Sequence, residues 1–423
     1  MMRKNKHSPL TAFLFTTLIL HLLDSCALQS SNTAVLWTDK PEFALYAEYF
    51  NANQDIYKIE TRYFESPAQK LTDNDGSYPD IVVGSWLKSA ATRNLFQPLD
   101  SFFKKNQISR ESFYPPLLAL GNIDGKQYLL PVAFNIPALV FSRDKGTLLS
   151  NPFTISLEEI REIGKTYNIE SNGIYSRMGF SPAWNDDFIF VSAVLFGASF
   201  REASPLEWDS RALEGSLSFI QDWIQEANTS IQAEDDFSFK YFYDPPAKLA
   251  QSGRILFFHM GSSEFFTLPQ ERRASLDFRW IAGKDTIPLS EDMVYYGIFR
   301  NSRAKKAAEA FTEWFFKEET QRLFLEAGKN NRLNETRFGI ANGFSALRTV
   351  TERIFPQFYP SLLGRMPPET FLTPPNILPR NWMAMKERVI LPYLHDRIRS
   401  ANQGEIRSLD RRLTDWARLN RGL

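Results

Sequence analysis

Apolar and polar positions along the chain follow two periods, one typical of buried strands and one typical of amphipathic helices. Residues 34–37 form an apolar run that predicts a strand, residues 41–53 predict a helix that begins at a proline, and residues 56–63 predict a second strand. Residues 81–84 are fully apolar, as expected for a strand buried in a parallel sheet. This order predicts an α/β fold, in which ligands bind at the carboxyl ends of the strands.

The later part of the chain has longer helical patterns. Ser156 suits the N-cap of a helix whose first turn carries Glu158 and Glu159, where negative charge is favourable. Helices are predicted over residues 155–167, 208–226, 247–252, 302–324, 382–399 and about 405–419, and strands over residues 255–260 and 288–299.

Residues 121–146 contain a break between two predicted strands. Residues 128–131 and 138–141 read as short strands, and Pro131 and Pro137 bracket the residues between them. Because proline has no backbone donor, residues 132–136 cannot donate fully to a sheet ladder. We therefore expect this stretch to cross between two sheets and to act as a hinge.

The composition is that of a folded protein with more than one domain. The chain has 423 residues, of which 43% are hydrophobic and 23% charged, and its formal net charge is zero. No basic surplus points to a nucleic-acid partner. The sequence has no Gly-x-Ser-x-Gly motif, no His-Glu-x-x-His motif and only four histidines, so neither a cofactor nor a metal site is expected.

The first residues have the features of an export signal. Arg3, Lys4 and Lys6 precede an apolar stretch, residues 10–23, that is too short for an ordinary membrane span. The stretch ends at Leu-Asp-Ser-Cys, which resembles a bacterial lipobox with Cys26 as the site of lipid attachment and membrane anchoring, although Asp24 departs from the usual pattern. The alternative is an ordinary secreted protein, or an uncleaved anchor, with an incidental cysteine. With a single cysteine, no intramolecular disulfide can form.

Several motifs together resemble one family. The passage GKQYLLPVAFNIPALVFSRD, the passage PDIVVGSW, the helical pattern of residues 302–324 and the passage PPNILPRNW are similar to segments of the extracellular solute-binding proteins of ABC importers, in the sugar-binding group that includes the maltodextrin-binding proteins. The resemblance implies a two-lobed α/β fold of the periplasmic-binding-protein type II class, each lobe being a mainly parallel sheet flanked by helices. Residues 1–26 would be the signal peptide, residues 27–133 with 285–330 the N-terminal lobe, and residues 134–284 with 331–423 the C-terminal lobe.

The resemblance also implies a sugar site between the lobes. Sugars offer hydroxyl edges and flat C–H faces, which carboxylates and aromatic rings respectively can bind. The candidate ligand-binding residues are Asp39, Trp86, Asn135, Trp184, Ser263, Glu264, Phe265, Tyr295 and Trp382. The alternatives remain open: Asp39 could be a helix cap, and the tryptophans could belong to the core.

The function implied is capture of a sugar or oligosaccharide, closure of the lobes and delivery to the permease subunits of an ABC transporter. Two other hypotheses remain. One is an exported glycoside hydrolase that pairs Glu264 with Asp292 or Asp187. The other is a lipoprotein that uses the same fold as a sensor or adhesin.

Overall fold

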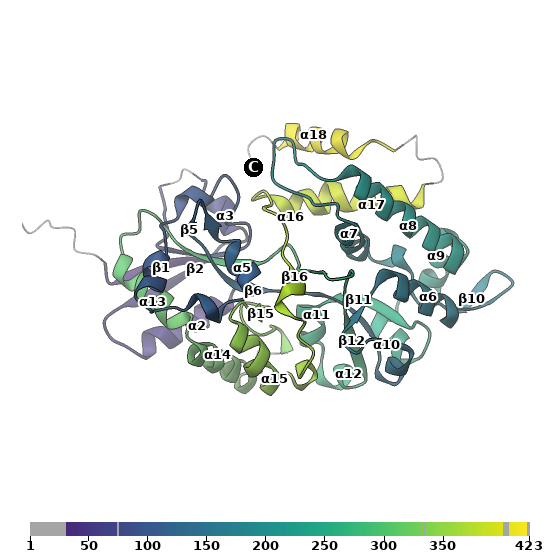
Figure 1. The fold of residues 1–423 in the computed structure, drawn as a ribbon, viewed down its shortest axis with the longest axis horizontal. Helices are drawn as coiled ribbons and strands as arrows, with labels where there is room; N and C mark the ends of the chain where they lie inside the picture. Colours follow the sequence, from purple (N-terminus) through teal and green to yellow (C-terminus); the bar gives the residue numbers. More distant parts are fainter. Residues whose placement is uncertain (1–30, 74–75, 333–334, 401–405, 421–423) are drawn as a thin grey trace, which may run out of the picture.

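The computed structural model describes residues 31–73, 76–332, 335–400 and 406–420. Figure 1 shows a first sheet at one end of the molecule and a second sheet at the other, each flanked by helices. The two-lobed α/β class expected from the sequence is therefore confirmed. The predicted signal peptide, residues 1–26, and the proposed lipid-attachment residue Cys26 lie outside the described residues.

The first sheet has six strands in the order β15-β6-β14-β3-β1-β2. Its strands are β1 (Thr33–Thr38), β2 (Lys58–Tyr63), β3 (Ile81–Gly84), β6 (Leu130–Phe134), β14 (Val294–Ile298) and β15 (Phe344–Ser345). Helices α2 (Glu42–Ala52) and α13 (Lys305–Phe315) pack against it through buried aromatic rings, with the ring centroids of Phe50 and Phe311 5.3 Å apart.

The second sheet has four strands in the order β11-β7-β12-β8. They are β7 (Pro137–Ser142), β8 (Thr154–Ile155), β11 (Phe257–Gly261) and β12 (Leu276–Ile281). Side chains alternate across β7, as the pleat requires. Leu139 and Phe141 pack into a core shared with α6 (Leu157–Tyr167), α7 (Asp186–Leu195), α8 (Ser210–Asn228) and α17 (Leu391–Arg399). Ala138 and Val140 face the opposite core, which also contains residues of the first sheet.

The remaining elements are shorter connections and covering helices. They are α3 (Pro67–Lys70), α4 (Asp100–Lys104), α5 (Pro115–Ala119), α9 (Ile231–Lys240), α10 (Pro246–Gln251), α11 (Ser262–Thr267), α12 (Gln270–Ala274), α14 (Glu318–Asn330), α15 (Phe355–Phe358), α16 (Trp382–Met385), α18 (Leu409–Leu419), β4 (Asn122–Ile123), β5 (Lys126–Gln127), β9 (Ile169–Ser171), β10 (Ile174–Arg177), β13 (Ile287–Pro288) and β16 (Leu372–Thr373). Within the described ranges, no helix combines the length and the apolar character needed to cross a membrane.

Two predicted helices differ from the structure. Residues 302–324 form two helices, α13 and α14, because the chain turns at Lys317 and a new first turn begins with Glu318 and Glu319. Residues 382–399 run through a π-helical segment, Lys386–Ile390, between α16 and α17. Pro392 follows this segment and has no backbone N–H, so the regular α-helical ladder cannot continue through it.

Strand directions place the carboxyl ends of several strands at the junction of the sheets. Each sheet contains one strand that arrives from the other sheet, and that strand runs antiparallel to its neighbours: β14 between β3 and β6, and β7 between β11 and β12. The sheets are therefore mixed rather than mainly parallel. The ends of β3, β6, β11 and β12 meet where the chain crosses from one sheet to the other.

The predicted crossing lies between β6 and β7. Only Asn135 and Ile136 separate the two strands. The prediction of a crossing is confirmed, but it is shorter than expected because Val132–Phe134 belong to β6. There Pro131 still pairs with β14 on one side, while Phe134 pairs with β15 on the other.

Asn135 ties together four pieces of chain at this crossing. Its side-chain oxygen accepts a hydrogen bond from the Ser262 hydroxyl (2.7 Å), and that hydroxyl oxygen accepts from the Ile136 N–H (3.1 Å). Its side-chain nitrogen donates to the Asn342 carbonyl (3.0 Å), and its own carbonyl accepts from the Ser290 N–H (3.0 Å). The start of α11, the chain before β14 and the chain before β15 are thus held at one point.

An apolar core also joins the two sheets beside this crossing. Phe266 of α11 stacks on Phe338, with ring centroids 4.7 Å apart. The ring centroids of Trp280 in β12 and Phe344 in β15 are 5.9 Å apart. All four rings are buried. The division of the chain into lobes stays a prediction. One part of it differs from the structure: β15 pairs with β6 of the first sheet, whereas the prediction places residues 331–423 in the C-terminal lobe.

We expect Asn135→Ala to lower the free energy of unfolding by about 2 kcal/mol, because it removes the acceptor of the buried Ser262 hydroxyl and the side-chain donor to the Asn342 carbonyl. Chemical denaturation measures the change. Asn301→Ala, at an exposed turn after β14, should change stability by less than about 0.5 kcal/mol. Equal effects of the two substitutions would contradict the role given to Asn135.

Candidate functional site

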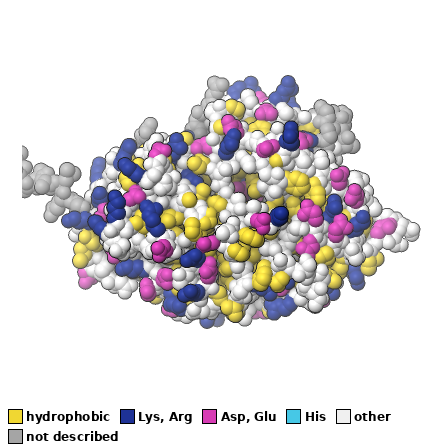
Figure 2. Space-filling model, viewed as in Figure 1, with side chains coloured by type: hydrophobic (Ala, Val, Ile, Leu, Met, Phe, Trp, Pro, Cys, Tyr) yellow, Lys and Arg dark blue, Asp and Glu magenta, His cyan; other side chains and the backbone are white. Residues whose placement is uncertain are grey.

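A cavity of about 540 Å³ lies at the junction of the two sheets. On the face drawn in Figure 2, hydrophobic side chains gather on both sides of the middle of the molecule. The cavity is lined from the first sheet by Trp86, which follows β3, and from the second by Gly261 at the end of β11 and by Ser263 and Glu264 of α11. Residues 288–292, residues 373–376, Leu378, the segment containing Trp382 and residues of α7 also line it. The carboxyl ends of β3 and β11 thus contribute to the cavity, while its use as a ligand site stays a prediction.

Five of the predicted residues line this cavity. They are Trp86, Asn135, Ser263, Glu264 and Trp382. Trp86 has a left-handed backbone (φ 58°), a conformation that is uncommon for a large side chain, and its ring packs against the cores of both lobes. Trp382 is 1% exposed and lies between Phe190 and Phe200, with ring centroids 6.1 and 5.8 Å away.

The other four predicted residues do not line it. Phe265 is 2% exposed and packs on Phe278, because residues 261–267 form a capped helix whose apolar side faces the core. Tyr295 is buried in β14 against Lys88. Trp184 lines a second, smaller cavity, and Asp39 lies beyond the lining, next to Gly84.

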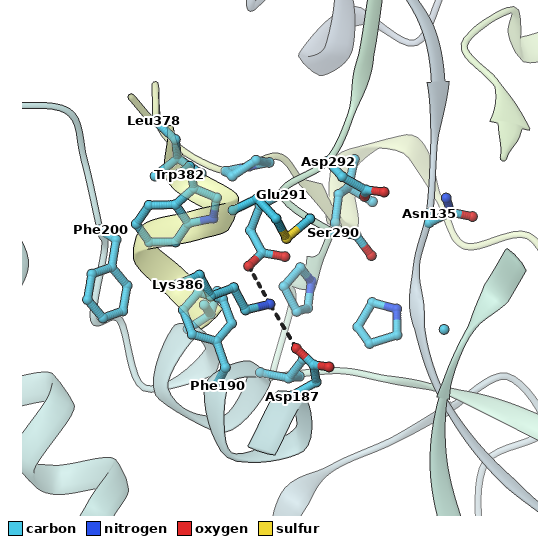
Figure 3. A pocket seen from close by; sticks show the side chains of 18 of the residues that line it. Asn135, Asp187, Phe190, Phe200, Ser290, Glu291, Asp292, Leu378, Trp382 and Lys386 are labelled. Carbon is cyan, nitrogen blue, oxygen red and sulfur yellow. Dashed lines mark ion pairs between the residues drawn. The ribbon is translucent and has the colours of Figure 1, made fainter. Parts of the chain in front are cut away.

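Lys386 forms the ionic centre of the cavity. Its ammonium group lies 2.8 Å from Glu291 and 2.9 Å from Asp187, and 4.3 Å from the centroid of the Phe190 ring (Figure 3). Burial by itself would lower the pKa of Lys386, but the two carboxylates outweigh it and raise that pKa above its ordinary value. Lys386 thus stays charged and links the C-terminal helices to the connector before β14.

Asp292 and Asp39 are half-buried acidic residues on the first-sheet side of the site. Burial raises the pKa of Asp292, and the charge of Lys40 opposes this rise. Burial also raises the pKa of Asp39, whose carboxylate lies 3.6 Å from Lys40 and close enough to Asp292 for the two to repel. Lys40 thus stabilises the charged forms of both carboxyl groups, and Lys386 also favours the charged form of Asp292.

Several polar groups on the cavity wall are buried without a partner. The indole N–H groups of Trp86 and Trp382 and both ring nitrogens of His259 have no hydrogen-bond partner within the part of the chain that the structure describes. Burial lowers the pKa of His259 to about 4, so its ring is neutral near pH 7. A buried donor without an acceptor is costly, and a bound ligand could supply one.

Lys386, Glu291 and His259 were not predicted from the sequence. Lys386 lies four residues after Trp382, and this helical spacing puts both on one face, which is a signal the pattern did contain. His259 is a polar residue near the end of a predicted apolar strand. Nothing local in the sequence connects Glu291 to Lys386, because they lie on separate segments that only the fold brings together.

A second cavity of about 250 Å³ lies beside α9. Its lining includes Trp184, Phe237 and His259, and His259 also lines the larger cavity. The Trp184 indole N–H donates to the backbone carbonyl of Glu234 (3.3 Å). The fully buried Glu234 carboxyl accepts hydrogen bonds from Ser181 and Asn228, and burial raises the pKa of Glu234 to about 7. Within the described residues, no group of three or more potential metal ligands is arranged to hold an ion.

Comparison with known proteins identifies the family. The family model for the bacterial extracellular solute-binding proteins matches residues 45–330. The chain belongs to this family. A search of the curated proteins finds no match to the sequence of this solute-binding protein. Membership in an extracellular family of binding proteins implies that the protein is exported.

Solved structures of sugar-binding proteins share the fold of this solute-binding protein. One is an ABC substrate-binding protein from Listeria monocytogenes in complex with cycloalternan (13% identity, TM-score 0.57, covering 90% of this chain and 96% of that one). A cyclic alpha-maltosyl-1,6-maltose binding protein from Arthrobacter globiformis has 17% identity and a TM-score of 0.58, with 90% and 96% covered. A maltose/maltodextrin-binding domain from Bdellovibrio bacteriovorus bound to maltotriose has 15% identity and a TM-score of 0.55, with 92% and 99% covered.

The buried His259 predicts a specific dependence of stability on pH. Its pKa is about 4 in the folded protein and 6.5 ordinarily, so the unfolded chain binds the proton more tightly. Its contribution to stability is present above pH 6.5 and is lost as the pH falls from 6.5 to 4. Asp187 and Lys386 are the charged groups that face it, and their effects on its pKa oppose each other.

We expect the stability of His259→Phe relative to the wild type to rise by about 3 kcal/mol between pH 7 and pH 4, because phenylalanine takes up no proton on unfolding. Denaturant titrations across this range measure the difference. Met260→Leu is the control, because it changes a neighbouring residue that does not titrate. Its stability relative to the wild type should be the same at every pH. A His259→Phe difference that is also independent of pH would be inconsistent with a buried neutral imidazole.

Proposed function

We propose that this solute-binding protein captures a sugar or oligosaccharide in the 540 Å³ cavity and delivers it to the permease subunits of an ABC importer. The observation that carries the proposal is the pair Trp86 and Trp382. They come from opposite lobes, line the same cavity and each have an unpartnered indole N–H among the described residues. An indole offers a flat apolar ring together with one donor, which matches the C–H face and the hydroxyl oxygens of a sugar.

The lining supplies the complementary acceptors. Glu291 and Asp292 present carboxyl oxygens, and Asn135 presents an amide, so hydroxyl groups of a ligand can donate as well as accept. The similar structures named above are sugar-binding proteins by their titles, which supports the same ligand class here.

Binding and lobe closure are connected by contacts from both lobes. A ligand that touches Trp86 and Trp382 together favours the closed arrangement by its differential affinity for it. The Ala90 N–H of the first lobe already donates to the Glu202 carboxylate of the second (2.7 Å), which is a contact that only neighbouring lobes can make. Closure would be the state that the permease recognises.

The contacts of the candidate catalytic pairs favour binding over hydrolysis. The Glu264 carboxylate accepts from the Gly261 N–H at the start of α11 (2.8 Å), and the Asp187 carboxylate is held by Lys386. A general acid or base needs a free oxygen directed at the scissile bond. One oxygen of Glu264 and one of Asp187 instead bind groups of the protein, which fixes how these two carboxylates are oriented.

We expect Trp86→Phe and Trp382→Phe each to weaken binding of a neutral oligosaccharide by about five- to tenfold, because phenylalanine keeps the ring but removes the donor. Isothermal titration calorimetry with maltotriose and mannotriose measures the affinities. Trp223→Phe is the matched control, since Trp223 is 1% exposed in the core of the second lobe and does not line the cavity.

The same samples test closure. Small-angle scattering should show a smaller radius of gyration with the sugar that binds. Binding without any dependence on the two indoles, or no binding across a panel of neutral and charged sugars, would overturn the sugar assignment.

We also propose that Cys26 carries a lipid that holds the exported protein at a membrane, near its permease. The support is the charged and apolar leader that ends at this residue, the only cysteine in the chain. Two or more acyl chains would anchor a protein stably, whereas one would not.

Metabolic labelling with radioactive palmitate tests the anchor. Label is expected in the wild type and absent in Cys26→Ala, which should also move from the membrane fraction to the soluble one. Equal labelling of both proteins would refute the proposal.

A further inference from the structure

The charges that line the large cavity are unbalanced. Its acidic residues are Asp187, Glu264, Glu291, Asp292 and Glu387, whereas Lys386 is the one lysine or arginine among the described residues that line it. Asp187, Glu264 and Glu387 are exposed at the rim, while the Glu291 side chain is only 18% exposed. Negative potential in a cleft with apolar walls is focused rather than screened.

The lysines in and near the cavity already form ion pairs with carboxylates of the protein. Lys386 is shared between Glu291 and Asp187 and also lies over the Phe190 ring. Behind Asp292, Lys40 lies against Asp39. His259 is neutral, since burial lowers its pKa to about 4. An anionic ligand would therefore find no free positive partner in the lining.

The unpartnered donors point to hydroxyl groups on the same ligand. Trp382 is 99% buried, and Figure 3 shows its indole nitrogen on the side of Glu291, within the cavity. Trp86 presents a second such donor from the other lobe. Each requires an acceptor, and a sugar hydroxyl oxygen is one, whereas an ammonium group is not.

We propose that the cavity selects a sugar that carries a protonated amino group, whose hydroxyl oxygens accept from Trp86 and Trp382 and whose ammonium group binds between Glu291 and Asp292. This inference rests on the proposed sugar-binding function and names the chemical class of its ligand. A hydrogen bond from a charged donor to a carboxylate is roughly twice as strong as one from a hydroxyl. The amino sugar is therefore preferred over its neutral counterpart, and a uronic acid is bound least.

Matched sugars test the charge on the ligand. Calorimetry on the full-length mature protein uses glucosamine against glucose, mannosamine against mannose and galactosamine against galactose. It also compares the trisaccharide of glucosamine with its N-acetylated form and with cellotriose. We expect the aminated member of at least one set to bind about tenfold more tightly than its uncharged partners, with an advantage that shrinks as sodium chloride is raised.

Variants test where the ammonium group binds. Asp292→Asn and Glu291→Gln should each reduce the ratio of affinities for the aminated and neutral sugars toward one. Glu271→Gln, which removes a carboxylate from the exposed first turn of α12, should leave the ratio as it is in the wild type. Thermal unfolding of each variant confirms that it is folded before binding is measured.

The outcomes separate this inference from the proposed function. If neutral sugars bind as tightly as aminated ones, or more tightly, the amino-sugar assignment is wrong while sugar binding stands. If an aminated sugar is preferred but the ratio is unchanged in Asp292→Asn and Glu291→Gln, the assigned position is wrong. If no sugar of any charge binds, both the inference and the proposed function fail.

Discussion

Asn135 lies at the crossing between β6 and β7 that connects the two sheets, and its hydrogen bonds fix several segments of the site. Its side chain and carbonyl bind Ser262, Ser290 and Asn342, so the segments that line the cavity after β6, after β11 and before β14 all start from one fixed position. On the neighbouring side, the rings of Phe266 and Phe338 fill the space between the sheets. Because this packed core spans both sheets, a rotation between the lobes would have to shift these rings as well as the backbone torsions around Asn135.

The cavity combines apolar aromatic walls with charged and hydrogen-bonding groups. Apolar rings exclude water, and in that environment each charge and each donor needs a partner. Lys386 meets this need for Glu291 and Asp187, while the indole N–H groups of Trp86 and Trp382 remain without acceptors in the described structure. Under the proposed function, a bound solute supplies the acceptors that these groups lack. The family match supports this view, because its members bind solutes.

The sequence predicted the lobes, the crossing and the two cavity-lining tryptophans because each has a local cause. Trp86 directly follows an apolar strand, and Trp382 follows a proline-rich break. The failures also have physical reasons. Phe265 faces the core because its segment is a capped helix rather than a loop, and the predicted helix of residues 302–324 ends where a second acidic first turn begins. Glu291 could not be assigned to Lys386, since the pairing depends on where the fold brings distant segments together.

The π-helical segment Lys386–Ile390 joins α16, which carries Trp382, to α17, which packs against the second lobe, in one continuous helical segment. Each residue of an α-helix turns the chain by about 100°, so adding or removing a single residue here would swing everything beyond it by that angle. Tyr393, Leu394 and Ile398, now buried against the second lobe, would be directed elsewhere. With the widened turn, the first part of this helical segment directs Trp382 and Lys386 to the cavity while the remainder packs against the second lobe. The number of residues between the two halves is therefore constrained more tightly than the identity of the side chains that line the cavity.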